Sequence, residues 1–356
     1  MNRLVIIGNG FDLAHGLKTS YNDFVDWYLE KRLKGLRQEL TYLSKDELCS
    51  FTLPREETWH AQMFQFPWET GYSFKNFWKM LEKSDYVKIE YSPLFSEILK
   101  DKAEKGWVDI ENEYYRMLKE ILKNNESCQE LNKQLLCLQK HLIEYLSTQK
   151  VEKNDVNYQC IILEDIKEQD ISNEGLHKVK EDVEHRKCDP FEMMDPEHIM
   201  MLSFNYTPTV KLYQNRNIEY NFIHGTLDKP ESIIFGFGDE LDKDYKELQE
   251  ANDNELLTNV KSVKYLEAPN YRDLLRFIES APFQVFIMGH SCGLSDRTLL
   301  NTIFEHNNCV SIKPFFYRKS DGSDNYLELV QNISRNFTDM KLFRDRVVNK
   351  TQCEIM

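Results

Sequence analysis

Four short polar segments each follow an apolar run directly, and their side chains are of the types that bind nucleotides and move protons. The first contains two glycines, whose backbone N–H groups can approach a phosphate closely. The others supply an amide, imidazoles, hydroxyls and a carboxylate. In chain order the segments are Gly8-Asn9-Gly10-Phe11-Asp12, Asn205-Tyr206-Thr207, His224-Gly225 and Gly289-His290-Ser291, with Asp296 five residues after the last of these.

Each residue also has a structural interpretation. Gly8 and Gly10 either cradle a phosphate or permit a tight strand-to-helix turn. Asp12 would repel phosphate, so a functional Asp12 meets a ribose hydroxyl or a base, whereas a structural one caps a helix. Asn205 is either a turn residue or a ligand. His224 is either a hydrogen-bonded structural histidine or a base at the mouth of a cleft.

A parallel sheet would bring these segments together. The apolar run at residues 4–7 has the composition of a strand buried on both faces, and similar runs occur further along the chain. Ligands of open α/β sheets bind at the carboxyl ends of the strands, so we expect one shared cleft. The expected strands are 4–7, 199–204, 221–223, 233–237, 284–288 and 310–316, with helices after Ser20 and over 295–304.

The predicted fold is therefore α/β, with a Rossmann-like parallel sheet flanked by helices and interrupted by a large, mainly helical insertion. We place the nucleotide-binding domain at residues 1–44 and 198–356 and the insertion at 45–197, of which 151–197 is highly charged and expected to be mobile. A helix near Trp107 carries Asp109, Glu111 and Glu113. These carboxylates form either a solvated face or, through Glu111, part of the cleft.

Composition narrows the functional classes. The 356 residues include 59 acidic and 45 basic side chains, giving a net charge of −14 and arguing against nucleic-acid binding by bulk charge. No apolar run reaches the roughly 18 residues of a membrane span, and the first apolar run is too short for a signal peptide. We expect a cytoplasmic protein with no membrane contact. Eight scattered cysteines without a C-x-x-C pair predict neither disulfides nor a metal site.

The segment Gly289–Gly293 also matches the G-x-S-x-G nucleophile elbow of α/β-hydrolases. That mechanism needs an acid and then a histidine further along the chain. Only His306 follows, 15 residues after Ser291 and near the end of the same expected helix. A hydrolase of this type is therefore disfavoured.

Five stretches resemble, in order, the signature segments of the AbiH family of bacterial abortive-infection, anti-phage proteins. They are LVIIGNGFDLAHGLKTSYNDF (4–24), GWVDIENEY (106–114), LSFNYT (202–207), FIHG (222–225) and IMGHSCGLSD (287–296). The pattern also resembles, more distantly, the sirtuin-like NAD-binding fold. That resemblance implies a phosphate loop at Gly8 and Gly10, a ribose contact at Asn205, a catalytic histidine at His224, and a closing loop at Gly289, Ser291 and Asp296.

The resemblance implies an anti-phage effector that binds a nucleotide, with NAD as the expected substrate, and hydrolyses its nicotinamide–ribose bond. Asn205 would hold the attacking water and His224 would activate it. Without zinc-binding cysteines, a protein deacetylase is not expected. The residues expected to contact the nucleotide are Gly8, Asn9, Gly10, Asp12, Glu111, Tyr206, Gly289, His290, Ser291 and Asp296.

Two alternatives remain open at this level. One is a nucleotide-sensing module without catalysis, acting through a partner defence protein. The other is a metal-dependent nuclease that uses Asp12 and Glu111. A phage-derived trigger is expected from the resemblance, as is self-association, to which the aromatic segment 59–78 would contribute unless it packs locally.

Overall fold

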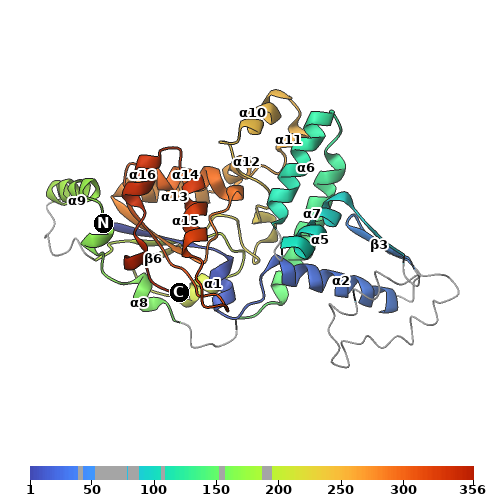
Figure 1. Ribbon diagram of the computed structural model, residues 1–356, viewed down its shortest axis with the longest axis horizontal. Coiled ribbons are helices and arrows are strands. Elements are labelled where there is room, and N and C mark those ends of the chain that lie inside the picture. The colour runs from blue at the N-terminus through green and yellow to red at the C-terminus, as the bar shows by residue number, and fades with distance from the viewer. Residues whose placement is uncertain (39–42, 53–77, 79–87, 106–108, 152–156, 187–194) are drawn as a thin grey trace. The chain divides into compact units, whose positions relative to one another are not determined.

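The computed structural model describes residues 1–38, 43–52, 78, 88–105, 109–151, 157–186 and 195–356 (Figure 1). They form two compact units. The sheet unit comprises residues 1–18, 150–252 and 259–356, and the helical unit comprises residues 19–149 and 253–258. Within the described part of the chain, no helix is both long and apolar enough to cross a membrane. Most of the aromatic segment 59–78 lies outside the described residues.

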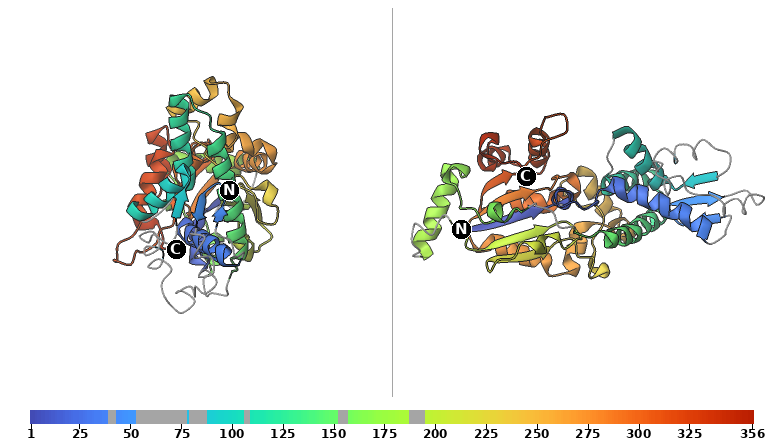
Figure 2. Two further views of the ribbon diagram at one scale, coloured as in Figure 1. Left: turned by 90° about the vertical axis from the view of Figure 1, so that its right-hand side faces the viewer. Right: turned by 90° about the horizontal axis from the view of Figure 1, so that it is seen from below.

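A five-stranded parallel sheet forms the centre of the sheet unit, in the order β6-β5-β1-β7-β8 (Figures 1 and 2). The predicted α/β class with a parallel sheet flanked by helices is confirmed. Successive side chains of a strand point to opposite faces, so a strand covered on both sides must be apolar throughout. The strands are β1 (Asn2–Ile7), β5 (Ile199–Ser203), β6 (Ile218–Phe222), β7 (Phe283–Met288) and β8 (Cys309–Pro314).

Each face of the sheet has its own core. Leu4 and Ile6 of β1 belong to a cluster formed with four helices that cover one face. Val5 and Ile7 belong to a second cluster, on the other face, with shorter helices. The first set of helices is α13 (Asn270–Ser280), α14 (Arg297–Phe304), α15 (Tyr326–Arg335) and α16 (Met340–Arg346); the second is α1 (Asn9–Ala14), α8 (Gln159–Ile162) and η5 (Thr209–Leu212).

Further short helices connect these elements in the sheet unit. They are η3 (Glu168–Asp170), α9 (Asn173–Arg186), η6 (Pro230–Ser232), α10 (Lys243–Glu250), α12 (Lys261–Lys264), η7 (Tyr265–Glu267), η8 (Leu294–Asp296) and η9 (Lys350–Gln352).

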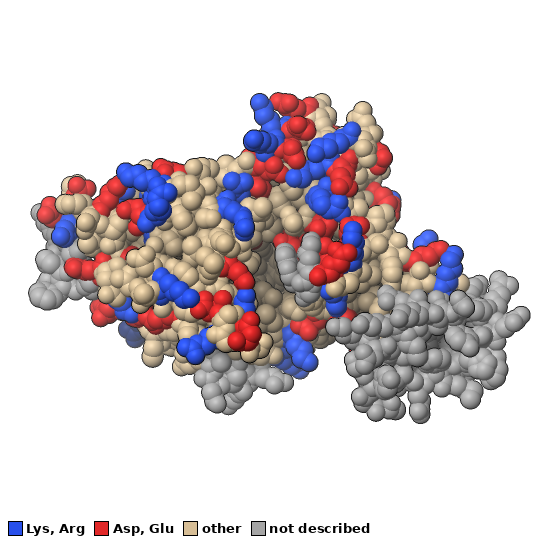
Figure 3. All heavy atoms as spheres, viewed as in Figure 1, with Lys and Arg blue, Asp and Glu red and all other residues tan. Residues whose placement is uncertain are grey.

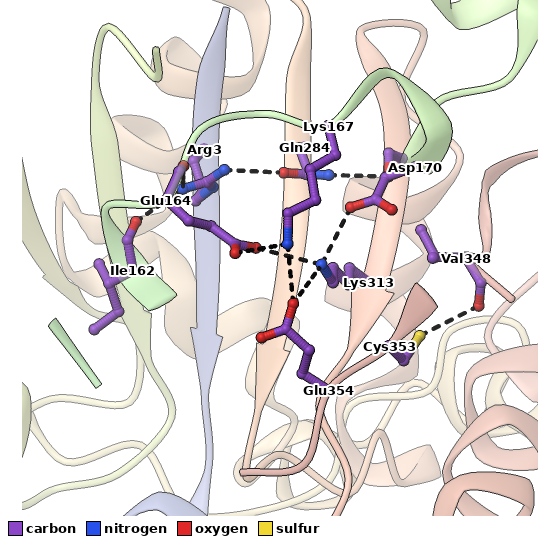
Figure 4. A network of polar contacts seen from close by, with 11 residues as sticks. Arg3, Ile162, Glu164, Lys167, Asp170, Gln284, Lys313, Val348, Cys353 and Glu354 are labelled. Atoms are coloured by element: carbon purple, nitrogen blue, oxygen red, sulfur yellow. Dashed lines mark hydrogen bonds and ion pairs between the residues drawn. The ribbon is translucent and has the colours of Figure 1, made fainter. Parts of the chain in front are cut away.

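A set of charges, buried at Arg3, Asp170 and Lys313, fastens the covering segments to the second face of the sheet (Figure 4). The Lys313 Nζ atom on β8 lies 3.2 Å from Asp170, 3.3 Å from Glu164 and 3.4 Å from Glu354. On β1, the Arg3 guanidinium donates to the carbonyl oxygens of Ile162 and Glu164, and burial lowers its pKa to about 10. We call this set the anchor network; its charged members are Arg3, Glu164, Lys167, Asp170, Lys313 and Glu354.

The helical unit combines helices with a small antiparallel sheet ordered β2-β3-β4. The predicted helix after Ser20 is present, and the Ser20 hydroxyl accepts a hydrogen bond from the Asp23 backbone N–H. The three strands were not predicted because they are short and polar. The elements are α2 (Tyr21–Gln38), β2 (Leu43–Lys45), β3 (Cys49–Thr52), β4 (Lys88–Tyr91), α5 (Pro93–Lys105), α6 (Ile110–Asn124), α7 (Gln129–Thr148) and α11 (Asn254–Leu257).

Four expectations about the chain's organisation need correction. The units divide near residues 18 and 149 rather than 44 and 197, because α2 packs on α7 whereas residues 157–186 pack on the sheet. Within the charged segment 151–197, Ile162 and Val179 are buried, so its described part is folded. Residues 233–237 form no strand, although Phe237 makes an isolated bridge with Val260. Gly8 through Asp12 is not a loop, because α1 begins at Asn9.

Candidate functional site

The carboxyl ends of four neighbouring strands lie in one row. Ile7 at the end of β1 pairs with Ser203 at the end of β5 and with Met288 at the end of β7, while Ser203 pairs with Phe222 at the end of β6. The four polar segments predicted from the sequence therefore leave the same edge of the sheet. Parallel register places them there, since each strand ends where its neighbour ends.

The two glycines after β1 allow its exit to pack directly on the exit of β7. The Gly10 N–H donates to the Gly289 carbonyl at 2.8 Å. A Cβ atom on Gly8 would lie 2.5 Å from the Cα of His290, and one on Gly10 would lie 2.9 Å from the Cα of Gly289. Gly289 itself has a φ of +72°, which L-residues rarely adopt. These glycines bring the first and last polar segments into contact.

His290, which adjoins this contact, belongs to a buried cluster of charged and polar groups around Asp296. The Lys261 Nζ atom is 2.7 Å from Asp296 Oδ1. The Nε2 atom of His224 is 3.4 Å from Oδ1, and the Nε2 atom of His290 is 3.6 Å from Oδ2. All four side chains are nearly inaccessible to solvent. We call His224, Lys261, His290 and Asp296 the strand-end cluster.

Hydrogen bonds assign the proton positions of one histidine of the cluster. The Cys292 backbone N–H donates to Nδ1 of His290 at 3.0 Å, so the neutral ring carries its proton on Nε2, which faces Asp296. His290 is therefore held in one tautomer and one orientation by its own loop.

Burial controls the charges of the cluster. Burial, aided by the positive charge of Lys261, lowers the pKa of His224 to about 3, so its imidazole is neutral near pH 7. Burial alone would raise the pKa of the Asp296 carboxyl, but Lys261 and the two histidines outweigh it and bring that pKa below its ordinary value. The cluster thus holds one buried ion pair and, at His224, a neutral ring.

His224 does not lie at the mouth of a cleft, where the sequence placed it. Its side chain is 4% exposed, and its Nε2 atom lies 3.1 Å from the Tyr265 hydroxyl. The Phe204 ring packs edge-on against the His224 ring, with 5.1 Å between the ring centroids. It also contacts the His290 ring, at a centroid distance of 4.2 Å. The ring is internal because the residues after β5 fold over the end of β6.

The segment after β5 is joined to its neighbours by hydrogen bonds from both half-buried and buried residues. The half-buried Asn205 donates from Nδ2 to the Gly8 carbonyl at 3.0 Å, and the Tyr206 hydroxyl donates to the Ile234 carbonyl at 3.1 Å. Asp12 is buried and accepts a hydrogen bond from the Thr207 hydroxyl. Burial raises the pKa of the Asp12 carboxyl despite that bond.

The groups at this sheet edge that reach solvent could contact a ligand. Asn9 and Ser291 are exposed, and Asn205, Tyr206 and Gly289 are half-buried. Their amides, hydroxyls and backbone groups suit a polar ligand such as the ribose or phosphate of a nucleotide. On the face drawn in Figure 3, acidic and basic side chains of the described residues are intermingled, with no continuous basic surface.

Glu111 is the one predicted site residue that belongs to the helical unit, where it is buried in the first turn of α6. Asp109 caps that helix by accepting a hydrogen bond from the Asn112 N–H at 3.0 Å. Glu113 is also buried, with the Arg116 guanidinium 2.8 Å away. The interpretation of these carboxylates as a solvated face is therefore wrong for Glu111 and Glu113.

Sequence reasoning missed Lys261, Tyr265 and Phe204. Lys261 stands at the start of a four-residue helix in a segment rich in charge, and nothing in its neighbourhood marks it as buried. Phe204 adjoins the predicted Asn205 but reads as the last apolar residue of its strand. These three residues share one feature, burial next to a strand end. That feature is visible only in the folded structure, so the sequence offered no signal for it.

Fold and site together define an α/β protein with a parallel sheet whose four adjacent strand ends enclose a buried Asp–Lys–His–His cluster. Residues 4–318 match the family model described as "Bacteriophage abortive infection AbiH". The chain belongs to the AbiH family, as its signature segments predicted. No curated protein and no solved structure matches it.

Proposed function

We propose that this protein acts in abortive infection by binding a nucleotide, NAD being the expected substrate, at the strand ends of the sheet unit and hydrolysing its nicotinamide–ribose bond. The family supports the anti-phage role. The observation that carries the nucleotide site is the convergence of Gly8, Asn205, His224 and Gly289 at one sheet edge.

The order of the strands supports a nucleotide ligand. If the five strands are numbered by their order along the chain, their order across the sheet is 3-2-1-4-5. The Rossmann-like doubly wound fold has its strands in this order. Ligands of that fold bind where the strand order reverses, which here is between the carboxyl ends of β1 and β7. Gly10 and Gly289 meet at that point, and Asn9 and Ser291 are exposed beside it.

The proposed reaction requires little covalent chemistry from the protein. The bond between ribose C1′ and the nicotinamide nitrogen breaks, its electron pair neutralises the cationic ring, and nicotinamide leaves. Water adds to C1′ and releases a proton. Asn205 would orient the water, and His224 would receive the proton, which requires that the bound nucleotide bring the water within reach of the enclosed ring.

The test is release of nicotinamide from NAD by the full chain, with and without phage lysate. His224→Gln and Asn205→Ala should each lower turnover by about 10²–10⁴-fold, the range for loss of acid–base assistance. His306→Gln is the matched control, because His306 follows α14 and lies outside the strand-end cluster. No release under either condition, or equal turnover in all variants, would overturn the catalytic proposal.

A second candidate function is nucleotide sensing without catalysis. It is favoured because neither histidine is placed to act as a base. His290 accepts a hydrogen bond from the Cys292 backbone N–H and faces Asp296. His224 is enclosed, and its pKa is far below neutral. Saturable binding of NAD or ADP-ribose by calorimetry, with no nicotinamide release, would support this candidate. Asn205→Ala should then weaken binding while His306→Gln leaves it unchanged.

A further inference from the structure

The helical unit contains a group of side chains of the kinds that bind transition metals. Cys137 and His141 are one turn apart on α7 and so project from the same side of the helix. Asp46, between β2 and β3, meets them there, and one ligand atom from each of the three residues lies within 4.8 Å of the others. We propose that Asp46, Cys137 and His141 bind a divalent transition-metal ion of the zinc class.

The spacing of the ligand atoms fits a shared ion. The His141 Nε2 and Asp46 Oδ2 atoms are 3.3 Å apart. That distance is at the long end of the range for the hydrogen bond that the two side chains form without an ion. Two atoms bound to one tetrahedral zinc ion at about 2.0–2.1 Å are about 3.4 Å apart. An imidazole, a thiolate and a carboxylate are also the ligand types that zinc prefers.

The surrounding groups hold the carboxylate in place. The backbone N–H groups of Leu48 and Cys49 donate to Asp46 Oδ1 at 2.9 and 3.0 Å, and the Tyr28 hydroxyl lies 3.0 Å from each carboxylate oxygen. Oδ2 therefore faces His141 without any movement of the chain. Such support is typical of the partners that orient metal ligands.

The second nitrogen of His141 is available to support a metal-bound ring. Its Nδ1 atom is buried and forms no hydrogen bond, although the Glu144 carboxylate lies 3.6 Å away. A metal-bound histidine usually donates its other N–H to a carboxylate or carbonyl. A small movement of Glu144, which is half exposed, would complete that bond.

The Arg32 guanidinium lies beside the proposed metal ligands and is compatible with a bound ion. The Arg32 Nε atom lies 3.5 Å from Asp46 Oδ2, but both Nε and Nη2 are buried without a hydrogen bond. When the ion binds, the Cys137 thiol releases its proton to solvent. The ion, the thiolate and the Asp46 carboxylate then sum to zero charge, so Arg32 faces a neutral site instead of a lone carboxylate.

Three protein ligands leave a fourth position for water or an exchangeable ligand. The ion would link the turn between β2 and β3 to α7, two parts of the helical unit that are about 90 positions apart in the sequence. The sequence analysis expected no metal because it sought closely spaced cysteine pairs. The usable signal was the Cys-x-x-x-His spacing on a helix, which supplies only two of the ligands.

The first experiment titrates the metal-free full chain with Co²⁺, which replaces zinc and reports a thiolate ligand by charge-transfer absorption. We expect saturation at one ion per chain and displacement by Zn²⁺. Cys137→Ser should abolish the absorption. Cys128→Ser is the control, because Cys128 is a buried cysteine immediately before the same helix. Absence of the absorption, or its persistence in Cys137→Ser, would overturn the proposal.

A second measurement does not depend on the cysteine variant folding. All five tryptophans lie within residues 19–149, and two of them, Trp27 and Trp78, belong to the described part of the helical unit, so their fluorescence reports on this unit. Zn²⁺ in excess over EDTA should raise the melting temperature of the parent protein and of Cys128→Ser by several degrees. His141→Gln should show no such rise. An equal rise in His141→Gln, or none in the parent, would refute the site.

Discussion

Two groups of buried charges in the described part of the sheet unit differ in what they hold together. The anchor network joins side chains of the sheet to segments that cover one face, and Lys313 there is surrounded by three carboxylates. The strand-end cluster instead joins loops that leave adjacent strands, and a single carboxylate, Asp296, serves one lysine and two histidines.

The difference indicates separate roles. Buried charges that are fully matched by opposite charges fasten one segment to another, and their removal affects folding. A neutral imidazole beside an ion pair, next to half-buried polar groups at a sheet edge, is the arrangement in which a bound ligand or proton transfer can be controlled. We therefore expect variants of the anchor network to change stability and variants of the strand-end cluster to change function as well.

The largest effect on stability is expected for Lys313→Met. The variant leaves Glu164, Asp170 and Glu354 without their central cation, and removing one partner of a buried ion pair lowers the free energy of unfolding by about 3–5 kcal/mol. Nicotinamide release per folded molecule should not change. Chemical denaturation followed by circular dichroism measures the loss.

Lys350→Met is the control for Lys313→Met, because Lys350 pairs with Asp324 on an exposed surface. It should leave the denaturation midpoint where it was. Equal losses in the two variants would contradict the distinction between buried and exposed pairs.

Gly289→Ala should lower the free energy of unfolding, because the loop before the strand-end cluster has no space for a Cβ atom at this position. A Cβ atom there would lie 2.1 Å from the Phe11 backbone nitrogen, and the residue would keep a φ of +72°. Strain of this kind lowers the unfolding free energy by about 1–3 kcal/mol. Thermal unfolding by circular dichroism tests the direction and size of the change.

Gly35→Ala is the opposite case. Gly35 lies within α2 with nothing near its Cβ position, and alanine there should stabilise the helix by up to about 1 kcal/mol. Tryptophan fluorescence measures this gain in the helical unit. If Gly35→Ala lowered the free energy of unfolding and Gly289→Ala left it unchanged, the open space at Gly35 and the close contacts at Gly289 would both be contradicted.

The last effect is a dependence of stability on pH, which is small near pH 7 and grows as the pH falls. The unfolded chain protonates His224 below about pH 6.5, whereas the folded chain does so only near pH 3. Stability therefore falls as pH falls across that window, by at most about 1.4 kcal/mol per pH unit from this residue. The lowered pKa of Asp296 adds a loss of the same sign at lower pH.

His224→Gln isolates the histidine's share of that dependence. The difference between the parent and variant unfolding free energies, measured from pH 7 to pH 4, should narrow as pH falls. Parallel curves would mean that His224 titrates normally in the folded protein, and would place it outside the buried cluster.

Local patterns in the sequence determined the strands and several helices. The apolar run at residues 4–7 indicated a strand buried on both faces because β-branched residues in continuous runs fit a covered parallel sheet. Ser20 and Asp23 indicated where α2 begins. The run at 233–237 misled because apolar composition does not distinguish a strand from a buried loop, and Ile233 to Phe237 are buried without pairing as a strand.

The candidate site was predictable only in part. Strand ends and polar residues are local, so the convergence of Asn205, His224 and Gly289 followed from the expected sheet. Burial was not predictable: His224 was expected in a cleft, and the fold of the segment after β5 encloses it. Lys261 was not foreseen, because its partner Asp296 is 35 positions away.

By itself, then, the sequence determined the fold class, the row of strand-end residues and membership of the AbiH family, since these depend on hydrophobic pattern and on short motifs. The tertiary structure decided which charged groups are buried together. Lys313 and Glu164 are 149 positions apart, and Asp46 and His141 are separated by most of the helical unit. Such contacts depend on chain packing, which brings residues together irrespective of their spacing, and this packing also sets the local dielectric that shifts their pKa values.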